Sequence, residues 1–311
     1  MEMQVSVMKK FEKEFINEVS MAKGILEAFI EKDYYVVKLI KIIAGFQSDS
    51  FHVTFSGGTS LSKGYGIINR FSEDIDFMVL SEPEDSRSVY RNFRKELFKK
   101  IEESGDLKVS ERDMIIGNES RFFSFYVDYP KLFDEKSLRQ QVKIEISAKE
   151  IRLSPKEQSV NSWIDEYLGN DIGLKINCLS PLETAANKFS AFLWRADCKD
   201  RTSADKKFND PTIIRHLYDI YKLKPVISAN EDKFYNLISK IYEDDKNRGD
   251  KSNDLTLKEF AYSTLSKIQS DSLYKKEYTD FVSNMVYKDS DIINYSEVLK
   301  YYTELIQHAE Y

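Results

Sequence analysis

The amino-acid sequence predicts an α+β fold: a mixed β-sheet flanked by helices, followed by an all-helical domain. Short segments with the period-two alternation of strands fill much of the first half of the chain. Beyond Pro181 the hydrophobic period becomes almost wholly helical. The chain also has 311 residues, 41% of them hydrophobic, which is enough to bury two cores. We therefore expect two domains.

The first half of the chain predicts the elements of the sheet domain. Apolar side chains recur at helical spacing from about residue 8 to 45, so this stretch is expected to be helical. Residues 52–56 and 76–80 predict two short buried strands, and 86–103 predict an amphipathic helix after them. Three later segments alternate as strands do: 107–116, 121–129 and 141–148. This order of elements implies a mixed sheet with helices packed on it.

The second half predicts helices only. Residues 182–195 form one, and 211–221 begin another, with Asp210 as N-cap and proline in the first turn. Further helices are expected from about residues 231, 255, 274 and 295. The boundary falls near 173–181, so we predict a sheet domain at 1–178 and a helical domain at 179–311.

Composition excludes several classes of protein. The two cysteines, Cys178 and Cys198, and three scattered histidines offer neither a disulfide framework nor a structural zinc site. Residues 1–14 are charged throughout and lack an apolar signal core. The most apolar early stretch, 34–46, is interrupted by lysines and too short to cross a bilayer. We expect a soluble cytoplasmic protein with no membrane contact.

The formal net charge of −6 argues against a protein that coats nucleic acid by bulk electrostatics. One stretch, residues 188–215, nevertheless carries seven cations against four aspartates, a local charge of +3. Its alternative interpretation is a solvated helix face with a loop.

A paired-glycine turn follows the first predicted strand, in the sequence FSGGTSLSK at 55–63. Glycines let backbone N–H groups approach a polyphosphate closely, and a helix N-terminus favours negative charge. The spacing of a Walker A loop is absent, and Asn69 stands where a dinucleotide fingerprint needs its third glycine. Taken alone, the motif is better explained as an ordinary strand-to-helix turn.

Two aspartates follow, Asp74 and Asp76, one residue apart and alternating with apolar side chains. At strand spacing both carboxylates point to one face, and they repel unless a cation lies between them. Glu145 obeys the same alternation in a later strand, where its alternative role is a cross-strand partner for a lysine. Mg²⁺ (or Mn²⁺), which takes oxygen ligands and shares them with substrate phosphates, suits such a set.

These residues resemble the AbiEii/AbiGii-type toxin nucleotidyltransferases, relatives of the MenT toxins in the DNA polymerase β-like superfamily. The resemblance rests on FSGGTSLSK at 55–63 and RFSEDIDF at 70–77. It continues in LETAANKFSAF at 182–192, which is similar to the family's lysine-bearing helix, and in RHLYDI at 215–220. Four blocks in the right order span about half of the chain.

The resemblance implies a nucleotidyltransferase fold and a role for each matching residue. Asp74, Asp76 and Glu145 would bind two divalent cations, and Lys188, on the helical domain, would reach the β and γ phosphates. Asp219 would be the acidic member of the last motif, or would instead orient Lys188 or Arg215. The nucleotide-binding residues would be Gly57, Gly58, Thr59, Ser60, Lys63, Ser72 and Lys188.

The resemblance further implies a bacterial toxin of a toxin-antitoxin or abortive phage infection system, with a cognate antitoxin as partner. It would transfer NMP from an NTP to RNA, particularly the tRNA 3′ end, and so block translation. The basic stretch would contact the RNA through Arg195, Lys199, Arg201, Lys206, Lys207 and Arg215. Two alternatives stay open: a small-molecule nucleotidyltransferase of the aminoglycoside-modifying kind, and a nucleotide-binding defence protein without transfer activity.

Overall fold

A computed structural model describes residues 2–46, 51–80, 86–170, 173–205, 208–246 and 254–308, and of residues 2–11 the backbone alone. Contacts divide the chain into two compact units. The sheet unit comprises residues 1–66 and 71–179, and the helical unit comprises 67–70 and 180–311. The segment 67–70 joins the helical unit because Arg70 bridges Val286, and the Asn69 carbonyl accepts a hydrogen bond from the Tyr287 amide.

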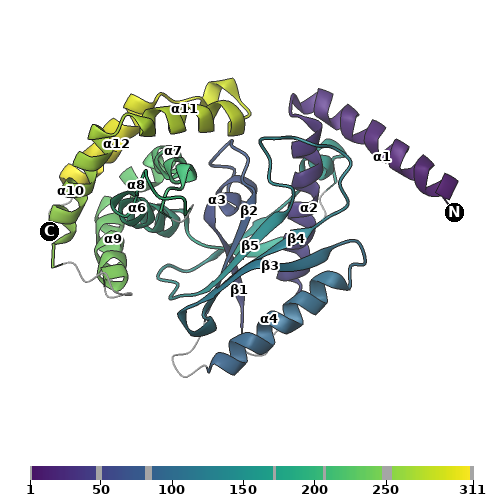
Figure 1. Ribbon diagram of the computed structural model, residues 1–311, viewed down its shortest axis with the longest axis horizontal. Helices are drawn as coiled ribbons and strands as arrows, with labels where there is room; N and C mark the ends of the chain where they lie inside the picture. The colour runs from purple at the N-terminus through teal and green to yellow at the C-terminus, as the bar shows by residue number, and fades with distance from the viewer. Residues whose placement is uncertain are drawn as a thin grey trace. The chain divides into compact units, whose positions relative to one another are not determined.

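The sheet unit contains a seven-stranded sheet in the order β3-β4-β5-β2-β1-β7-β6 (Figure 1). β2 pairs antiparallel with β1 and parallel with β5, so the sheet is mixed as predicted. The strands are β1 Val53–Ser56, β2 Asp74–Val79, β3 Lys108–Gly117, β4 Phe122–Asp128, β5 Val142–Ala148, β6 Lys156–Ser159 and β7 Lys175–Cys178. The helical segments of this unit are α1 Glu2–Lys23, α2 Glu27–Ala44, α3 Gly57–Thr59, η1 Ser60–Gly64, α4 Arg87–Glu102, η2 Asn118–Ser120 and α5 Trp163–Tyr167.

α2 and α4 share the core of this unit with one face of the sheet. Ile75 and Phe77 of β2 belong to that core, together with Phe93 of α4 and Ile144 of β5. Because side chains alternate along a strand, the residues between them face the opposite side of the sheet. The aspartates of β2 therefore lie on the face away from α2 and α4.

The helical unit is built around α6, which contacts α7, α8, α9 and α10. Its buried residues include Phe189 and Phe192, whose rings pack against Tyr302 of α12. The elements are α6 Pro181–Asp197, η3 Pro211–Ile214, α7 Arg215–Lys222, α8 Lys224–Ser228, α9 Glu231–Lys246, α10 Leu257–Ser270, α11 Leu273–Met285, η4 Asp289–Asp291 and α12 Tyr295–His308. Asp210 caps η3 through the Thr212 amide, as its sequence position predicts.

Three predictions about elements were wrong or incomplete. The single helix expected over 8–45 is two helices, because Gly24 adopts a φ of +65° and the chain turns there. β2 begins at Asp74 rather than Asp76, so both aspartates lie inside the strand. Finally, β6, α5 and β7 were not foreseen.

Candidate functional site

The loop after β1 brings its backbone directly against the carboxylate of Asp76. Gly57 has a φ of +74°, and a Cβ atom added there would lie 1.9 Å from Oδ2 of Asp76. Neither the backbone angle nor the space accommodates another residue. In the same loop the Thr59 hydroxyl donates to the Asp74 carbonyl, and the Ser56 hydroxyl donates to the Asp76 carbonyl at 3.2 Å. The paired-glycine turn is thus bonded to the strand that carries the acids.

The three acids of the sheet lie on two paired strands. In the parallel ladder of β2 with β5, Asp76 is the partner of Glu145 and Asp74 is the partner of Lys143. Partners in a ladder project to the same face, and Asp74 and Asp76 share a face because they are two residues apart. The backbone therefore gathers all three carboxylates on one side of the sheet.

Two cations that the sequence analysis left out contact these acids. Nη1 of Arg139 lies 2.7 Å from Oδ1 of Asp74, and the Lys143 ammonium group pairs with Glu145. Lys143 lies two residues before Glu145 on the same strand, so this contact is not the cross-strand lysine pairing that the sequence left open as an alternative. Arg139 is fixed by its backbone, because its amide donates to Glu73 and its carbonyl accepts from the buried Lys32, both at 2.6 Å. In this arrangement Arg139 and Lys143 supply positive charge beside the carboxylates.

The oxygen donors of Asp74, Asp76 and Glu145 suit a hard divalent cation, and the ladder register places their strands side by side. Among the described residues, however, no three His, Cys, Asp or Glu side chains are grouped as they would be around an ion. A cation bound there would compete with Arg139 for Asp74 and with Lys143 for Glu145. The residues fit the ion in chemistry, while the side chains are paired with protein cations.

The remaining predicted phosphate ligands of the sheet unit differ in their contacts and in their burial. Lys63 lies 2.5 Å from the buried carboxylate of Asp33 and 4.5 Å from the centre of the Trp163 ring. The sequence predicted Lys63 as a phosphate ligand and did not indicate this ion pair with Asp33. Gly58, Thr59 and Ser60 are buried in the turn, and Ser72 is half-buried in the segment before β2.

In the helical unit, Asp219 holds two cations. Its carboxylate accepts from Nε and Nη2 of Arg70 at 2.7 and 2.6 Å, and Nζ of Lys188 lies 2.7 Å from its Oδ2. All three side chains are buried. Burial alone raises the pKa of Asp219, but Arg70 and Lys188 outweigh it and hold that pKa at about 2. Asp219 therefore forms buried ion pairs with both Arg70 and Lys188.

The neighbouring His216 is buried, and burial together with the cations Lys188, Arg195 and Arg215 holds its pKa well below the ordinary value. The imidazole is therefore neutral at pH 7. A neutral ring beside Lys188 adds no further positive charge to this part of the unit.

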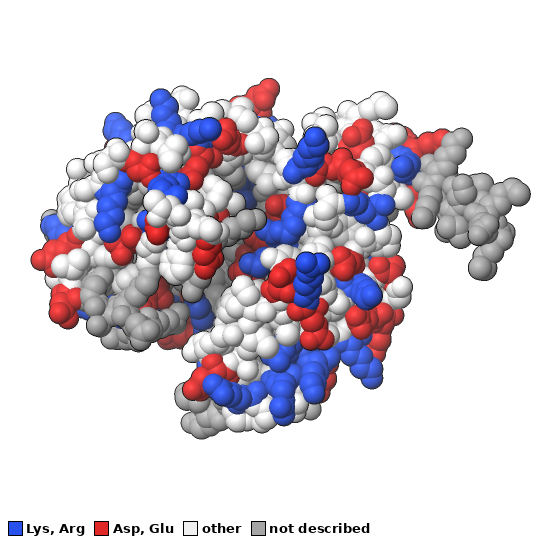
Figure 2. Space-filling model, viewed as in Figure 1, with Lys and Arg blue, Asp and Glu red and all other residues white. Residues whose placement is uncertain are grey.

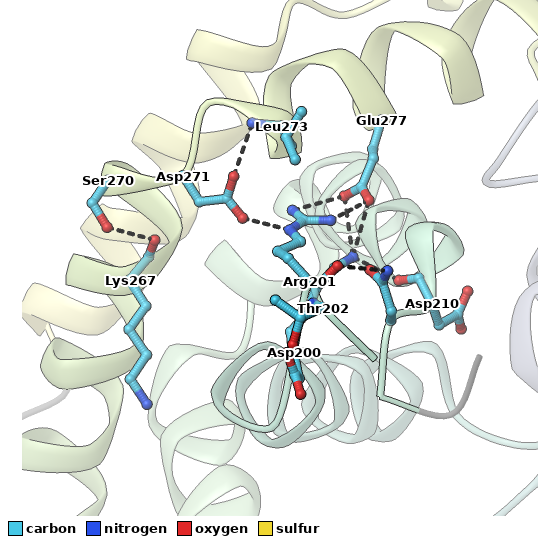
Figure 3. A network of polar contacts seen from close by, with 11 residues as sticks. Asp200, Arg201, Thr202, Asp210, Lys267, Ser270, Asp271, Leu273 and Glu277 are labelled. Atoms are coloured by element: carbon cyan, nitrogen blue, oxygen red, sulfur yellow. Dashed lines mark hydrogen bonds and ion pairs between the residues drawn. The ribbon is translucent and has the colours of Figure 1, made fainter. Parts of the chain in front are cut away.

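Of the six predicted RNA-contacting residues, Lys199 and Arg201 pair with acidic side chains of the helical unit, and Figure 3 shows the contacts of Arg201. Arg201 pairs with Glu277 and, through Nε at 2.7 Å, with Asp271 at the N-terminal end of α11. Lys199 lies 3.1 Å from the same Glu277. These contacts anchor the segment between α6 and η3. Of the other predicted contacts, Arg195 is exposed, Arg215 is half-buried, and Lys206 and Lys207 lie outside the described residues.

Comparison with known proteins defines the class of protein. The solved structure of MenT4, a nucleotidyltransferase toxin from Mycobacterium tuberculosis H37Rv, matches 93% of this chain and 98% of its own, with a TM-score of 0.55 and 16% identity. The chain thus has the fold of a nucleotidyltransferase. The antibiotic-resistance factor ANT(2'')-Ia matches 68% of this chain and 93% of its own at 17% identity, but its TM-score of 0.36 is too low to define a shared fold. Among curated proteins, no sequence matches with significance.

The family follows from the sequence. The model of the nucleotidyl transferase AbiEii toxin family, from type IV toxin-antitoxin systems, matches residues 41–304, so the chain belongs to that family. It is a nucleotidyltransferase enzyme of the toxin kind, and the family implies an NTP substrate and an antitoxin partner. Enzymes of this kind use an NTP with a divalent metal. No helix among the described residues is long and apolar enough to span a membrane.

Proposed function

We propose that the chain transfers a nucleoside monophosphate from an NTP to the 3′ end of tRNA, in a reaction that depends on Mg²⁺ or Mn²⁺, and so blocks translation. The observation that carries this proposal is the pairing of Asp76 with Glu145 in the β2–β5 ladder, with Gly57 packed against the Asp76 carboxylate. Acids on one face beside a glycine turn are what a nucleotidyl-transfer site needs.

In this proposal Asp74, Asp76 and Glu145 would hold the divalent metal. Bound there, the metal would neutralise phosphate charge and make the acceptor hydroxyl a better nucleophile. Gly57 and Gly58 would offer backbone N–H groups to the triphosphate, with Thr59, Ser60 and Ser72 around them. These groups orient the nucleotide, and transfer of phosphoryl groups depends mainly on such positioning.

Lys188 would stabilise the negative charge that gathers on the departing pyrophosphate. Asp219 is its proposed positioning residue, because it holds the ammonium group at 2.7 Å; burial lowers the pKa of Lys188, and the Asp219 charge opposes that lowering. We do not assign Lys63 to the phosphates, since its contact with the buried Asp33 already satisfies its charge. Of the predicted RNA contacts, Lys199 and Arg201 pair with Glu277. The proposed contributors are the exposed Arg195, together with Arg215 and with Lys206 and Lys207, which lie outside the described residues.

For the setting in the cell we propose a bacterial cytoplasm and a role in abortive phage infection, with neutralisation by the antitoxin. This part rests on membership of the AbiEii toxin family. A matching cell assay is growth arrest on induction of the wild-type chain and normal growth on induction of Asp76→Ala.

The decisive experiment supplies α-labelled NTPs, one base at a time, with deacylated tRNA or with small hydroxyl compounds. Wild-type protein should label tRNA in Mg²⁺ or Mn²⁺ and not in a chelator, and Asp76→Ala and Lys188→Ala should fold and lose transfer. Asp280→Asn, an exposed aspartate of α11, is the control and should retain it. Labelling of a small acceptor in preference to tRNA supports the small-molecule alternative. Toxicity that survives Asp76→Ala supports a protein that acts by binding.

A further inference from the structure

The solvent-facing part of α4 carries a row of cations. Arg87, Arg91, Lys95 and Lys99 recur every fourth residue, and all four are exposed. Four residues of an α-helix rise about 6 Å and turn about 40° past one full turn, so these charges follow one another as neighbours in a row that winds gently around the helix. We call these four residues the α4 ridge. Figure 2 shows the cationic side chains gathered along this helix at the lower edge of the view.

The opposite side of α4 fixes the direction of the ridge. Tyr90, Phe93, Leu97 and Ile101 are buried and belong to the core that α4 shares with the sheet. Phe93 packs against Phe123 of β4, with ring centres 6.3 Å apart. Because this apolar stripe holds the helix in one orientation, the ridge faces away from the core.

The ridge is electrostatically unfavourable for the protein alone. Over its length α4 has six cations against two glutamates, a local charge of +4 in a chain of net charge −6. Like charges four residues apart destabilise a helix by about 0.2–0.5 kcal/mol a pair. Within the part of the chain that the structure describes, no ridge residue forms an ion pair, although the adjacent Lys100 pairs with Glu103 at 3.2 Å. The ridge thus contrasts with Lys199 and Arg201, whose charges are satisfied.

We propose that the α4 ridge binds the phosphate backbone of the RNA acceptor; this inference rests on the proposed function. A row of cations at regular spacing matches the charge pattern of a phosphodiester chain. The exposed side chains between them, Ser88, Asn92 and Glu96, are polar. The core of a protein interface, or insertion into a bilayer, requires exposed apolar side chains, which these positions lack.

The location of the ridge also indicates the size of the acceptor. The apolar stripe of α4 packs on the sheet face that carries Ile75 and Phe77, and Asp74 and Asp76 face the other side. The ridge therefore contacts the body of the acceptor rather than its reacting hydroxyl. A folded RNA such as tRNA is large enough to contact both faces of the sheet unit, and a small hydroxyl compound is not. Aromatic Tyr90 and Phe93 point inward, so the contact involves phosphates rather than stacked bases.

The test compares two variants with the same net charge. The ridge variant is Arg87→Gln, Arg91→Gln, Lys95→Gln and Lys99→Gln combined. The control removes four exposed lysines of the helical unit: Lys233→Gln, Lys240→Gln, Lys275→Gln and Lys276→Gln. Binding of fluorescent deacylated tRNA is followed by anisotropy from 50 to 200 mM NaCl, and thermal unfolding is recorded for each protein.

The ridge variant should bind tRNA at least about tenfold more weakly than wild type at 100 mM NaCl. Its slope of log K against log salt should be smaller by about 3, since four phosphate contacts contribute about 0.7–0.9 each. The control should bind as wild type does. The melting temperature of the ridge variant should equal or exceed that of wild type, because repulsion along α4 is removed.

Equal tRNA binding by the ridge variant and wild type overturns the inference, and if wild type still labels tRNA the proposed function stands. Ridge-dependent binding to phosphatidylglycerol vesicles or to the antitoxin, with tRNA binding unchanged, also overturns it. Conversely, ridge-dependent tRNA binding by a wild-type protein that transfers nothing supports the ridge and removes the proposed reaction. The two proposals are thus separately testable.

Discussion

Gly57 occupies a position where both the backbone angle and the available space require glycine. Its φ of +74° disfavours any L side chain, and Oδ2 of Asp76 lies where a Cβ atom would go. Its backbone therefore limits where the Asp76 carboxylate can lie. This coupling of a loop backbone to an acid of the adjacent strand gives a sharp test.

Gly57→Ala should reduce nucleotidyl transfer at least about a hundredfold, because the methyl group displaces Asp76 by an ångström or more. It should also lower the free energy of unfolding by about 1–2 kcal/mol through the backbone angle. Gly105→Ala is the matched control, since Gly105 has a φ of +80° with no atom within 4 Å of an added Cβ. The control should lose similar stability and keep full transfer rates. Equal activity in the two variants contradicts the coupling of Gly57 to Asp76.

Asp219 makes stability depend on pH in the acid range. Its folded-state pKa of about 2 lies below the ordinary 3.8, because the charges of Arg70 and Lys188 outweigh burial. The unfolded chain therefore binds a proton at higher pH than the folded chain does. The stabilisation, about 2–3 kcal/mol for this shift, is complete above pH 4 and is lost as pH falls toward 2.

Urea unfolding at intervals from pH 5 to pH 2.5 measures this effect as a falling midpoint. In Lys188→Met, which keeps the Arg70 contact, the decline attributable to Asp219 should be smaller. Asp219→Asn should be less stable throughout by about 3–5 kcal/mol, because it leaves two buried cations without a carboxylate. Asp280→Asn should decline as wild type does. A Lys188→Met profile parallel to that of wild type rules out Lys188 as a source of the low pKa.

At the scale of elements, the parallel pair β2 and β5 places two protein cations beside the acids. Arg139 contacts Asp74, and Lys143 contacts Glu145. These pairs are partly exposed, and each such contact is worth about 1 kcal/mol or less. A divalent ion that binds the same carboxylates would share them with these positive charges, so we expect the protein cations and the metal to compete.

Arg139→Gln combined with Lys143→Gln should therefore bind Mn²⁺ about fivefold more tightly in the absence of nucleotide, as measured by calorimetric titration. Lys108→Gln combined with Lys131→Gln, which removes two cations from positions away from these acids, is the control and should match wild type. Weaker Mn²⁺ binding by the first variant is incompatible with competition at the acids.

The elements that sequence alone predicted share a strong periodic pattern. β4 and β5 alternate clearly, and α4 has an apolar stripe, so these elements were confirmed. β6 is four residues of exposed or half-buried polar side chains, so pairing rather than composition makes it a strand. β7 alternates exposed and buried side chains over only four residues, which is too short a pattern to predict a strand. The break at Gly24 was missed because apolar residues at helical spacing continue on both sides of it.

The residues of the candidate site also differ in whether a local sequence pattern indicates them. Alternation along each strand was enough to place Asp74, Asp76 and Glu145 on faces of their own strands, but their cross-strand register required the structure. Arg139 lies in an irregular segment without periodicity, so nothing in the sequence pointed to it. Arg70 lies four residues before Asp74, and its contact with Asp219 spans 149 positions, a separation that local patterns do not report.

At the scale of the whole molecule, charge is unevenly distributed. The net charge is −6, while α4 alone carries +4 and the 188–215 stretch +3. In the latter stretch Lys199 and Arg201 are neutralised by Glu277 and Asp271. Attraction of a polyanion to this acidic protein therefore depends on local cations, chiefly on the α4 ridge.

Transfer to tRNA should consequently fall with salt while the chemical step is spared. With four phosphate contacts, raising NaCl from 50 to 200 mM should lower kcat/KM for tRNA by about a hundredfold, with kcat nearly constant. The ridge variant should lose most of this dependence, and the lysine control should keep it. Measurements at a fixed excess of Mg²⁺ and NTP separate the effect from metal and nucleotide binding. A flat response of wild-type kcat/KM contradicts phosphate contacts as the source of acceptor affinity, because released counterions always make such binding sensitive to salt.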